Sequence, residues 1–383
     1  MKKIKLGDAC EILNGFAFKS ENYVGSGIRV IRISNVQKGY IEDNTPAFYP
    51  LETKGLEKYM LEEGDLLISL TGNVGRVAIL EKEFMPAALN QRVACLRLKT
   101  DKLSKRYLFH ILNSDFFEKQ CIQYSKGVAQ KNMSTAWLKD YEILLYSKEQ
   151  QELIADILDK MHLIKKLRYY ELQKLDELVK ARFVEMFGDP NIEFKYSSVK
   201  FNDLVARMTK GPFGSDMKKD LFVPKGEDTY KVYIQINAIQ KNQSLGEYYI
   251  SKEYFDRKVS RFELFPNDYI ITCDGTLGKY LKLDENMEKG VISPSLLRLT
   301  LQNDKINDKY FENIWDFYML GLMKKEARNA CLVHLPSAKK IGEISIPVPP
   351  LKLQNQFASF VQEVDKSRLL SNHSLFLIKS IIF

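Results

Sequence analysis

The sequence has few of the residues that build metal centres and disulfide frameworks. Its 383 residues include five cysteines, none of them in a Cys-x-x-Cys pair, which argues against a structural zinc site and against disulfide bonds. The four histidines, at positions 110, 162, 334 and 373, do not have metal-ligand spacing. We therefore expect no metal on this chain, and the cysteine usage fits a reducing, cytoplasmic environment.

Long apolar runs and catalytic motifs are also missing. No run reaches the length of a membrane span, and no apolar core follows the basic start as it would in a signal peptide. Residues 275–279 lack the spacer and hydroxyl of a phosphate-binding loop, and no Gly-x-Ser-x-Gly or Asn-Pro-Pro-aromatic motif occurs. Glu52 and Lys54 have no preceding Pro-Asp to form a nuclease motif. We expect no catalytic residues and no cofactor on this chain.

The composition supports packed cores and an anionic partner. Apolar residues make up 45% of the chain and aromatic residues 11%, which excludes a mostly disordered protein. Lysine and arginine number 57 against 49 acidic residues, so the net charge is +8. A surplus of this size is compatible with binding to a polyanion such as DNA.

The chain contains an internal repeat. When it is shifted by 203 residues, matching residues recur in constant register over about ninety positions. The matched pairs include Asp65 with Asp268, Gly72 with Gly275, Gly75 with Gly278, Tyr107 with Tyr310 and Gln151 with Gln354. Two units of this length indicate two related domains rather than a solenoid.

Each repeat predicts the same order of elements. A hairpin is expected over 66–80 and again over 269–283, each with a Gly-x-x-Gly turn. Helical segments are expected over 107–124 and 310–328. A long helix follows each unit; residues 148–187 contain no glycine or proline, and Gly188 is expected to end that helix.

Apolar residues recur along both long helices at near-heptad spacing. This stripe predicts packing against another helix or a partner protein. Its selected members are Ile154, Ile157, Met161, Ile164, Leu175, Leu178, Phe357, Phe360 and Val364. If the two helices pair antiparallel, an approximate two-fold axis relates the two units, as in duplex DNA, and the helix length sets the distance between them.

The loops of the two units carry different polar side chains, many of a kind that contacts base edges or phosphates. The candidates in the first unit are Lys19, Arg32, Asn35, Asn73, Arg76, Gln91, Arg92, Gln130, Lys131 and Asn132. Those in the second are Lys210, Ser215, Gln235, Asn237, Asp274, Thr276, Lys279, Ser293, Ser295 and His334. One scaffold with two sets of loops would suit the reading of two different DNA half-sites.

Taken in order, these motifs resemble the DNA-specificity subunits of type I restriction-modification enzymes. The resemblance covers essentially the whole chain. In the first half it rests on residues 15–20, 33–36, 64–75, 90–91 and 96–97, and in the second on 267–278, 346–351 and Gln354. The segment 143–147 departs from the family pattern because it lacks the usual prolines, and the C-terminal helix is shorter than the central one.

The resemblance implies an α+β chain with two tandem mixed α/β target-recognition domains and two long helices packed as an antiparallel coiled-coil pair. The expected boundaries are 1–147 for the first domain, 148–188 for the central helix, 189–350 for the second domain and 351–383 for the C-terminal helix. Such a subunit has no active site. It binds bipartite double-stranded DNA, and its partners are methylation subunits, which use S-adenosylmethionine, and restriction subunits, which use ATP and Mg²⁺.

Two alternatives stay open at this point. A protein-interaction scaffold, or a silent specificity copy, would share the helices but would not bind DNA sequence-specifically. A nuclease or methyltransferase with an unfamiliar motif would show turnover when the purified chain is given magnesium or S-adenosylmethionine.

Overall fold

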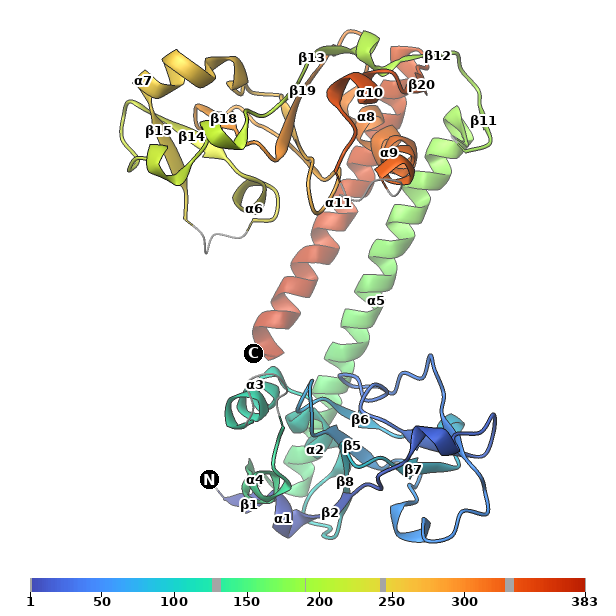
Figure 1. Cartoon of the computed structure of the whole chain (residues 1–383). Coiled ribbons are helices and arrows are strands. Elements are labelled where there is room, and N and C mark those ends of the chain that lie inside the picture. The colour runs from blue at the N-terminus through green and yellow to red at the C-terminus, as the bar shows by residue number, and fades with distance from the viewer. Residues whose placement is uncertain (1, 126–131, 190, 242–245, 328–333, 383) are drawn as a thin grey trace. The chain divides into compact units, whose positions relative to one another are not determined.

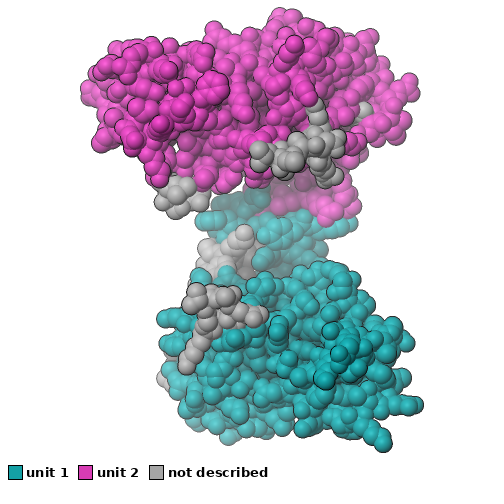
Figure 2. Space-filling model, viewed as in Figure 1, with its two compact units in different colours: residues 1–170, 372–383 teal, residues 171–371 magenta. Residues whose placement is uncertain are grey.

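The computed structural model describes residues 2–125, 132–189, 191–241, 246–327 and 334–382 (Figure 1). The chain forms two compact units (Figure 2). Unit 1 consists of Met1–Tyr170 with Asn372–Phe383, and unit 2 of Glu171–Ser371. Among the described helices, none combines the length and the apolarity needed to cross a membrane.

Unit 1 contains three small sheets. A four-stranded antiparallel sheet has the order β2-β8-β5-β6, a mixed sheet has the order β4-β3-β7, and β1 pairs with β9. The strands are β1 (Lys3–Lys5), β2 (Cys10–Asn14), β3 (Ile28–Ile31), β4 (Phe48–Tyr49), β5 (Leu66–Ser69), β6 (Val77–Ile79), β7 (Ala87–Leu89), β8 (Val93–Leu98) and β9 (Glu142–Leu144). The helices are α1 (Leu6–Ala9), α2 (Lys105–Leu112), α3 (Asp115–Tyr124) and α4 (Thr135–Asp140), together with the first part of α5 (Lys148–Phe187).

Unit 2 repeats this topology. Its sheets have the orders β13-β19-β16-β17 and β15-β14-β18, and β12 pairs with β20. Its strands are β10 (Gly188–Asp189), β11 (Glu193–Phe194), β12 (Ser198–Lys200), β13 (Val205–Lys210), β14 (Thr229–Tyr233), β15 (Tyr248–Ser251), β16 (Tyr269–Thr272), β17 (Tyr280–Lys282), β18 (Gly290–Ile292), β19 (Leu296–Leu301) and β20 (Ser345–Pro347). Its helices are α6 (Gln235–Ala238), α7 (Lys252–Tyr254), α8 (Asp308–Ile314), α9 (Leu320–Ala327) and α10 (Ala338–Gly342), with the end of α5 and most of α11 (Leu351–Ile382). The internal repeat predicted from the sequence is confirmed: each described strand of unit 1 has a counterpart in unit 2, and unit 2 adds the pair β10 and β11.

In each four-stranded sheet, one inner strand, β5 in unit 1 and β16 in unit 2, contributes side chains to two cores; we call it the central strand. In unit 1, Leu66 and Ile68 of β5 face the helices α2 to α4, whereas Leu67 faces the core beneath the mixed sheet. In unit 2, Tyr269 and Ile271 of β16 face the core that the helices cover, and Ile270 faces the other. Because side chains alternate along a strand, a fully apolar strand supplies both cores at once.

Neither of the two predicted helical segments is one regular α-helix. In unit 1 the segment divides at Asn113 and Ser114 into α2 and α3, and the Ser114 hydroxyl accepts a hydrogen bond from the Phe117 N–H at 3.2 Å. In unit 2 the segment is continuous as far as Ala327, with a π-helical turn over Trp315–Met319 that joins α8 to α9, and residue 328 lies outside the described residues. A serine favours an N-cap because its side chain satisfies a free N–H of the first turn.

Both long helices form where the sequence predicts them. Helix α5 ends at Gly188, which has a φ of +91° and so closes the helix in the left-handed conformation. Helix α11 begins directly after Pro349 and Pro350, because proline starts a helix without losing an internal hydrogen bond. At 32 residues, α11 is shorter than α5 with its 40 residues.

Within unit 2, the end of α5 packs antiparallel against the start of α11. Phe187 and Phe183 both contact Phe357, with ring centroids 5.5 and 5.6 Å apart. Earlier on α5 and later on α11, Arg182 lies over the ring of Phe360. Partners that run in opposite directions along the chain define an antiparallel pair, as predicted.

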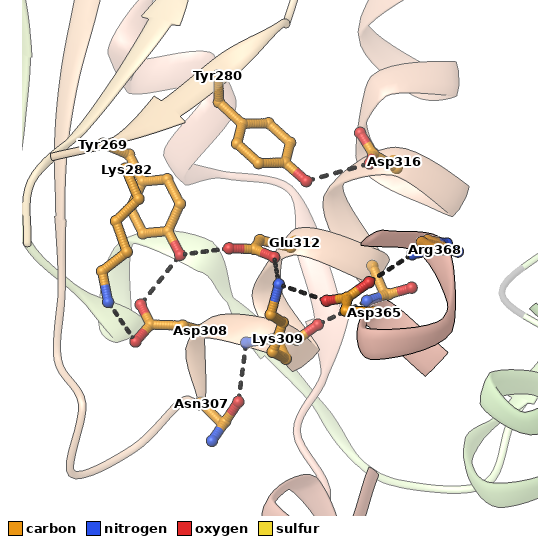
Figure 3. Close-up of polar contacts among 11 residues, drawn as sticks. Tyr269, Tyr280, Lys282, Asn307, Asp308, Lys309, Glu312, Asp316, Asp365 and Arg368 are labelled. Carbon is orange, nitrogen blue, oxygen red and sulfur yellow. Dashed lines mark hydrogen bonds and ion pairs between the residues drawn. The ribbon is translucent and has the colours of Figure 1, made fainter. Parts of the chain in front are cut away.

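Ion pairs join α11 to α8 (Figure 3) and to α5. Arg368 of α11 binds Asp176 of α5 at 2.7 Å and Asp365 of its own helix at 2.8 Å. Lys309 of α8 reaches the same Asp365 at 3.2 Å. The long helices of unit 2 are therefore fastened to the globular part by charge as well as by aromatic packing.

The selected apolar residues of the long helices fall into two groups. Phe357 and Val364 are buried, and Ile154, Met161, Leu175 and Phe360 are partly buried. Ile157, Ile164 and Leu178 are instead 44–49% exposed on α5. About half of each of these three side chains is therefore open to another protein.

Candidate nucleic-acid interface

In each unit, loops that are far apart in the sequence meet at the end of the central strand. In unit 1 the residue after β5 is Leu70, whose N–H donates to the Arg92 carbonyl at 3.0 Å and whose carbonyl accepts from the Met133 N–H at 2.8 Å. In unit 2, Cys273 makes the same two bonds to Ser295 and Leu335, each at 2.9 Å. We call the resulting surfaces loop cluster 1 and loop cluster 2.

Loop cluster 1 joins three segments of unit 1. The hairpin turn carries Asn73, and the connection between β7 and β8 carries Gln91 and Arg92, all three exposed. A backbone bridge joins Thr71 of the hairpin to the exposed Asn132. Four predicted residues therefore lie together, with amide and guanidinium groups of the kind that bind base edges.

Loop cluster 2 joins the equivalent segments of unit 2. A bridge between Asp274 and His334 takes the place of the one between Thr71 and Asn132. The connection between β18 and β19 contributes the partly buried Ser295, whose hydroxyl oxygen lies 3.3 Å from that of Ser293. Ser293 was predicted as a contact, but it is 4% exposed and is not open to a base. Further members from the predicted set are Lys210, Gln235, Thr276 and Lys279.

In each unit, a glycine lets the loop after β2 or β13 lie directly on the backbone of the connection between β7 and β8 or between β18 and β19. A Cβ at Gly15 would stand 2.2 Å from the carbonyl of Asn90, and one at Gly211 would stand 2.0 Å from the carbonyl oxygen of Ser293. Neither position has room for a larger residue. The close approach fixes the loop after β2 or β13 beside the loop that carries Gln91 or Ser295.

A side-chain hydroxyl holds each hairpin turn. The Ser69 hydroxyl donates to the Asn73 carbonyl and accepts from the Arg76 N–H at 3.0 Å. Thr272 makes the same pair of bonds, to the Thr276 carbonyl and from the Lys279 N–H at 3.0 Å. The turn backbone is thus held rigidly, and its side chains are left to face outward.

The cations that follow these turns have different surroundings. Arg76 is partly buried and its guanidinium donates to the Gln37 side chain. Lys279 is exposed, and within the described part of the chain no side chain pairs with its ammonium group. Lys279 is therefore the better placed of the two to bind a phosphate.

Several predicted residues lie outside the loop clusters. Asn35 is 3% exposed, and its amide holds the Glu42 carbonyl and the Asp43 carboxylate while its oxygen accepts from the Arg32 N–H. Arg32 donates to the Thr45 carbonyl. Asn35 thus stabilises a loop and leaves no amide group for a base.

The remaining predicted residues stand apart from both clusters or are not described. Lys19 has an exposed side chain beside Glu21, and its backbone is bound to the Tyr49 hydroxyl. Ser215 is exposed, and Asn237 donates to the Gly246 carbonyl. Gln130 and Lys131 lie outside the described residues.

The structure adds residues that the sequence did not single out. A cavity of about 810 Å³ lies beside the second hairpin turn and is lined by Lys279 together with Asp316, Leu320 and Lys324. Lys324 comes from α9, and no pattern in the sequence connects α9 to the hairpin. In unit 1, Thr71 and Gln37 were missed for the same reason, because their partners Asn132 and Arg76 are distant in the sequence.

The clusters contain no catalytic arrangement among their described residues. Burial raises the pKa of the Cys273 thiol to about 12, so it stays protonated at neutral pH. Across the described chain, no three histidine, cysteine, aspartate or glutamate side chains gather as ligands for a metal ion. The clusters present hydrogen-bonding and charged side chains on a fixed backbone, as a binding surface does.

Comparisons with known proteins agree with this geometry. The family model "Type I restriction modification DNA specificity domain" matches residues 1–176 and 214–378. The chain is 28% identical over 184 residues to the type I restriction enzyme MjaVIII specificity subunit of Methanocaldococcus jannaschii, a match that covers 46% of the chain and 43% of that protein. It is 23% identical over 401 residues to the EcoBI specificity subunit of Escherichia coli, covering 94% and 78%.

Solved structures share the fold. An S subunit of a type I restriction-modification system from M. genitalium aligns with a TM-score of 0.56 at 14% identity, covering 100% of this chain and 93% of that one. A chain from a structure described as "Structural basis underlying complex assembly and conformational transition of the type I R-M system" aligns with a TM-score of 0.62 at 14% identity, covering 100% and 95%.

Proposed function

The chain belongs to the type I restriction modification DNA specificity family, and we propose that each of its units reads one half of a bipartite double-stranded DNA target for catalytic partner subunits. The observation that carries this proposal is the pair of loop clusters. They stand on the same strand topology and are built by the same backbone bonds, yet they present different side chains. A duplicated scaffold with divergent loops gives two readers of two different sequences.

The chemistry of the reaction belongs, in this proposal, to partners. Methylation subunits would carry S-adenosylmethionine, and restriction subunits would carry ATP and Mg²⁺, with the whole assembly acting on DNA in the cytoplasm. The specificity subunit itself would bind and position the target without breaking or forming a bond. A purified chain that showed turnover with magnesium or S-adenosylmethionine would contradict this division of roles.

The exposed apolar residues of α5 support a docking role for the long helix. Ile157, Ile164 and Leu178 are exposed by nearly half, and Leu153 and Leu167 by more than half. Within unit 1, Leu153, Ile157, Ile164 and Leu167 fall on one side of the helix at 100° per residue, and exposed apolar side chains arranged in this way are typical of a protein interface. We assign it to the methylation subunits, and we expect the lengths of α5 and α11 to set the spacing between the two half-sites.

The test is a map of methylated bases in the host genome with and without this gene, with the methylation subunits produced in both strains. We expect one split motif, with an unspecified spacer, to lose its methylation when the gene is deleted. An unchanged map would contradict DNA reading and would leave the role of a protein-interaction scaffold. No observation on the described residues favours that second role.

A further inference from the structure

One difference between the clusters is a hydrogen-bonded pair of side chains, Asp274 and His334, in loop cluster 2. Asp274 lies two residues after the end of β16, before the hairpin turn, and its Oδ1 is hydrogen-bonded to Nδ1 of His334. A carboxylate only accepts hydrogen bonds, so Nδ1 of His334 is the donor. The side chains are 36% and 48% exposed, and no hydrogen bond to a described residue occupies Oδ2 of Asp274.

A carboxylate is an unusual group to place on a surface that binds DNA, because the phosphates repel it. Lys210 and Lys279 are exposed members of the same cluster, and they supply the positive charge that attracts the backbone. Within the grooves, a carboxylate is matched only by a hydrogen-bond donor. In the major groove these donors are the exocyclic amino groups N4 of cytosine and N6 of adenine.

The equivalent pair of loop cluster 1 does not require a hydrogen-bond donor on the bound base. There Thr71 and Asn132 form the same backbone bridge, and hydroxyl and amide groups both donate and accept hydrogen bonds. The difference between the clusters is therefore chemical rather than architectural. Where unit 1 has Thr71 and Asn132, which can donate or accept, unit 2 has the carboxylate of Asp274, which only accepts and is held in place by His334.

We propose that Asp274 is a specificity-determining residue that accepts a hydrogen bond from the exocyclic amino group of a cytosine or adenine in the half-site of unit 2. His334 is its positioning residue: it occupies Oδ1 and turns Oδ2 toward the groove. Guanine and thymine present only acceptors at their major-groove edges, so a carboxylate disfavours both at that position. The inference rests on the proposed function, since it concerns how one unit reads its half of the target.

The experiment maps methylated motifs in cells that produce the methylation subunits with the wild-type chain or with one of four variants. Asp274→Ala should relax the preference at a single position of one half-site by about tenfold, while the other half-site keeps its sequence. His334→Ala should relax the same position less strongly. His334→Gln should restore it in part, because an amide N–H can replace the Nδ1 donor.

Glu343→Gln is the matched control. It also removes one negative charge from unit 2, but Glu343 pairs with Lys200 beside β12 and β20, away from the hairpin residues. Its motif should equal that of the wild type. Any general effect of charge on DNA affinity would appear in this variant, whereas a lost base contact would not.

The outcomes distinguish a failure of this inference from a failure of the proposed function. If the wild-type chain directs no split motif while the methylation subunits are present and folded, the proposed function fails. If wild type directs a motif and Asp274→Ala leaves it unchanged, the inference is overturned and the function stands. If Asp274→Ala abolishes methylation, a second experiment measures the affinity of this variant for duplexes in which each base of the half-site is changed in turn. Preserved base discrimination at every position overturns the inference. Lost discrimination at one position supports it.

Discussion

Gln151 and Gln354 hold equivalent backbone groups at the start of the two long helices. The Gln151 side chain accepts from the Ser104 N–H at 2.8 Å and donates to the carbonyls of Lys102 and Tyr146 at 2.8 and 2.9 Å. Gln354 accepts from the Asn307 N–H at 2.8 Å and donates to the carbonyls of Lys305 and Pro349 at 3.2 and 2.7 Å. Both side chains are fully buried, and each fastens a long helix to its own globular unit.

Replacing either glutamine by alanine should therefore destabilise one unit and spare the other. Three backbone groups, at least one of them buried, lose their hydrogen-bond partner in each variant, and an unsatisfied buried group costs about 1–3 kcal/mol. We expect about 3 kcal/mol or more in the unfolding free energy of unit 1 for Gln151→Ala and of unit 2 for Gln354→Ala. Denaturant unfolding followed by hydrogen exchange resolves the two units. Gln173→Ala, at an exposed site on α5, is the control and should change little.

The sequence predicts those features of the fold that depend on local pattern. Both hairpins and the end of α5 at Gly188 were predictable because turn glycines and a long stretch without helix breakers act within a few residues. The parallel pairing of β3 with β7 was not, because it joins Arg29 to Ala87 across distant chain segments. No local pattern specifies such a partner.

The residue types of the candidate site were predictable from the sequence, but which of these residues lie together was not. Gln91, Arg92 and Asn132 are polar residues in loops, as the sequence shows, and the structure places them together. Asn35 is equally polar and equally in a loop, yet it is buried with its amide bound to Glu42 and Asp43. Whether a loop amide faces the solvent or folds back on its own loop depends on tertiary contacts that composition does not encode.

The close contact made by Gly15 and by Gly211 leads to a second prediction. An added Cβ would overlap a backbone carbonyl at 2.2 or 2.0 Å, so Gly15→Ala and Gly211→Ala should force the loop after β2 or β13 away from its neighbour. Overpacking of this kind costs about 1–3 kcal/mol, and we expect a lower melting temperature and weaker specific DNA binding. Gly25→Ala and Gly214→Ala are matched controls for stability because nothing lies within 4 Å of their added Cβ. Equal melting temperatures for all four variants would contradict the predicted overlap.

The exposed Lys279 leads to a prediction about salt. If its ammonium group contacts a phosphate, Lys279→Ala should weaken binding to specific and non-specific DNA alike and should reduce the salt slope of log K by about 1. Titrations of the assembled complex at several salt concentrations measure this slope. Lys200→Ala removes an equally charged but ion-paired lysine beside β12 and should leave the slope unchanged. A slope unaffected by Lys279→Ala would mean that the hairpin turn does not meet the backbone.

The exposed apolar side of α5 leads to a prediction about assembly. Ile157 and Ile164 are two turns apart and 49% and 44% exposed, so Ile157→Lys and Ile164→Lys should leave folding intact while placing a charge in the proposed interface. We expect at least a tenfold loss of affinity for the methylation subunits, measured by calorimetry. Lys166→Ala changes an exposed residue nine positions from Ile157, on the opposite side of the helix at 100° per residue, and should bind normally. Unchanged affinity in both isoleucine variants would move the interface elsewhere.

His110 of α2 is the buried titratable group that links α2 to the start of α5. Its side chain is 3% exposed, and Nε2 lies 2.7 Å from Oδ1 of Asp159. Burial lowers the pKa of His110, although Asp159 opposes the shift, and the neighbouring His162 and Arg106 add to it. The pKa of Asp159 is lowered in turn: burial would raise it, but its bonds to Arg106 and His110 outweigh that effect.

These shifts predict that acid destabilises unit 1. The pKa of His110 is lower in the folded chain than its value of about 6.5 in the unfolded chain, so the unfolded state takes up the proton first. The stabilising contribution of neutral His110 is therefore complete above about pH 6.5 and is lost as the pH falls through the folded pKa. Unfolding free energies measured from pH 8 to pH 5 should show this decline in unit 1. His110→Gln, which cannot take a proton but can donate to Asp159, should flatten the profile, whereas His162→Gln, an exposed neighbour on α5, should keep most of it. A profile that declines equally in the His110→Gln variant would assign the acid sensitivity to another group.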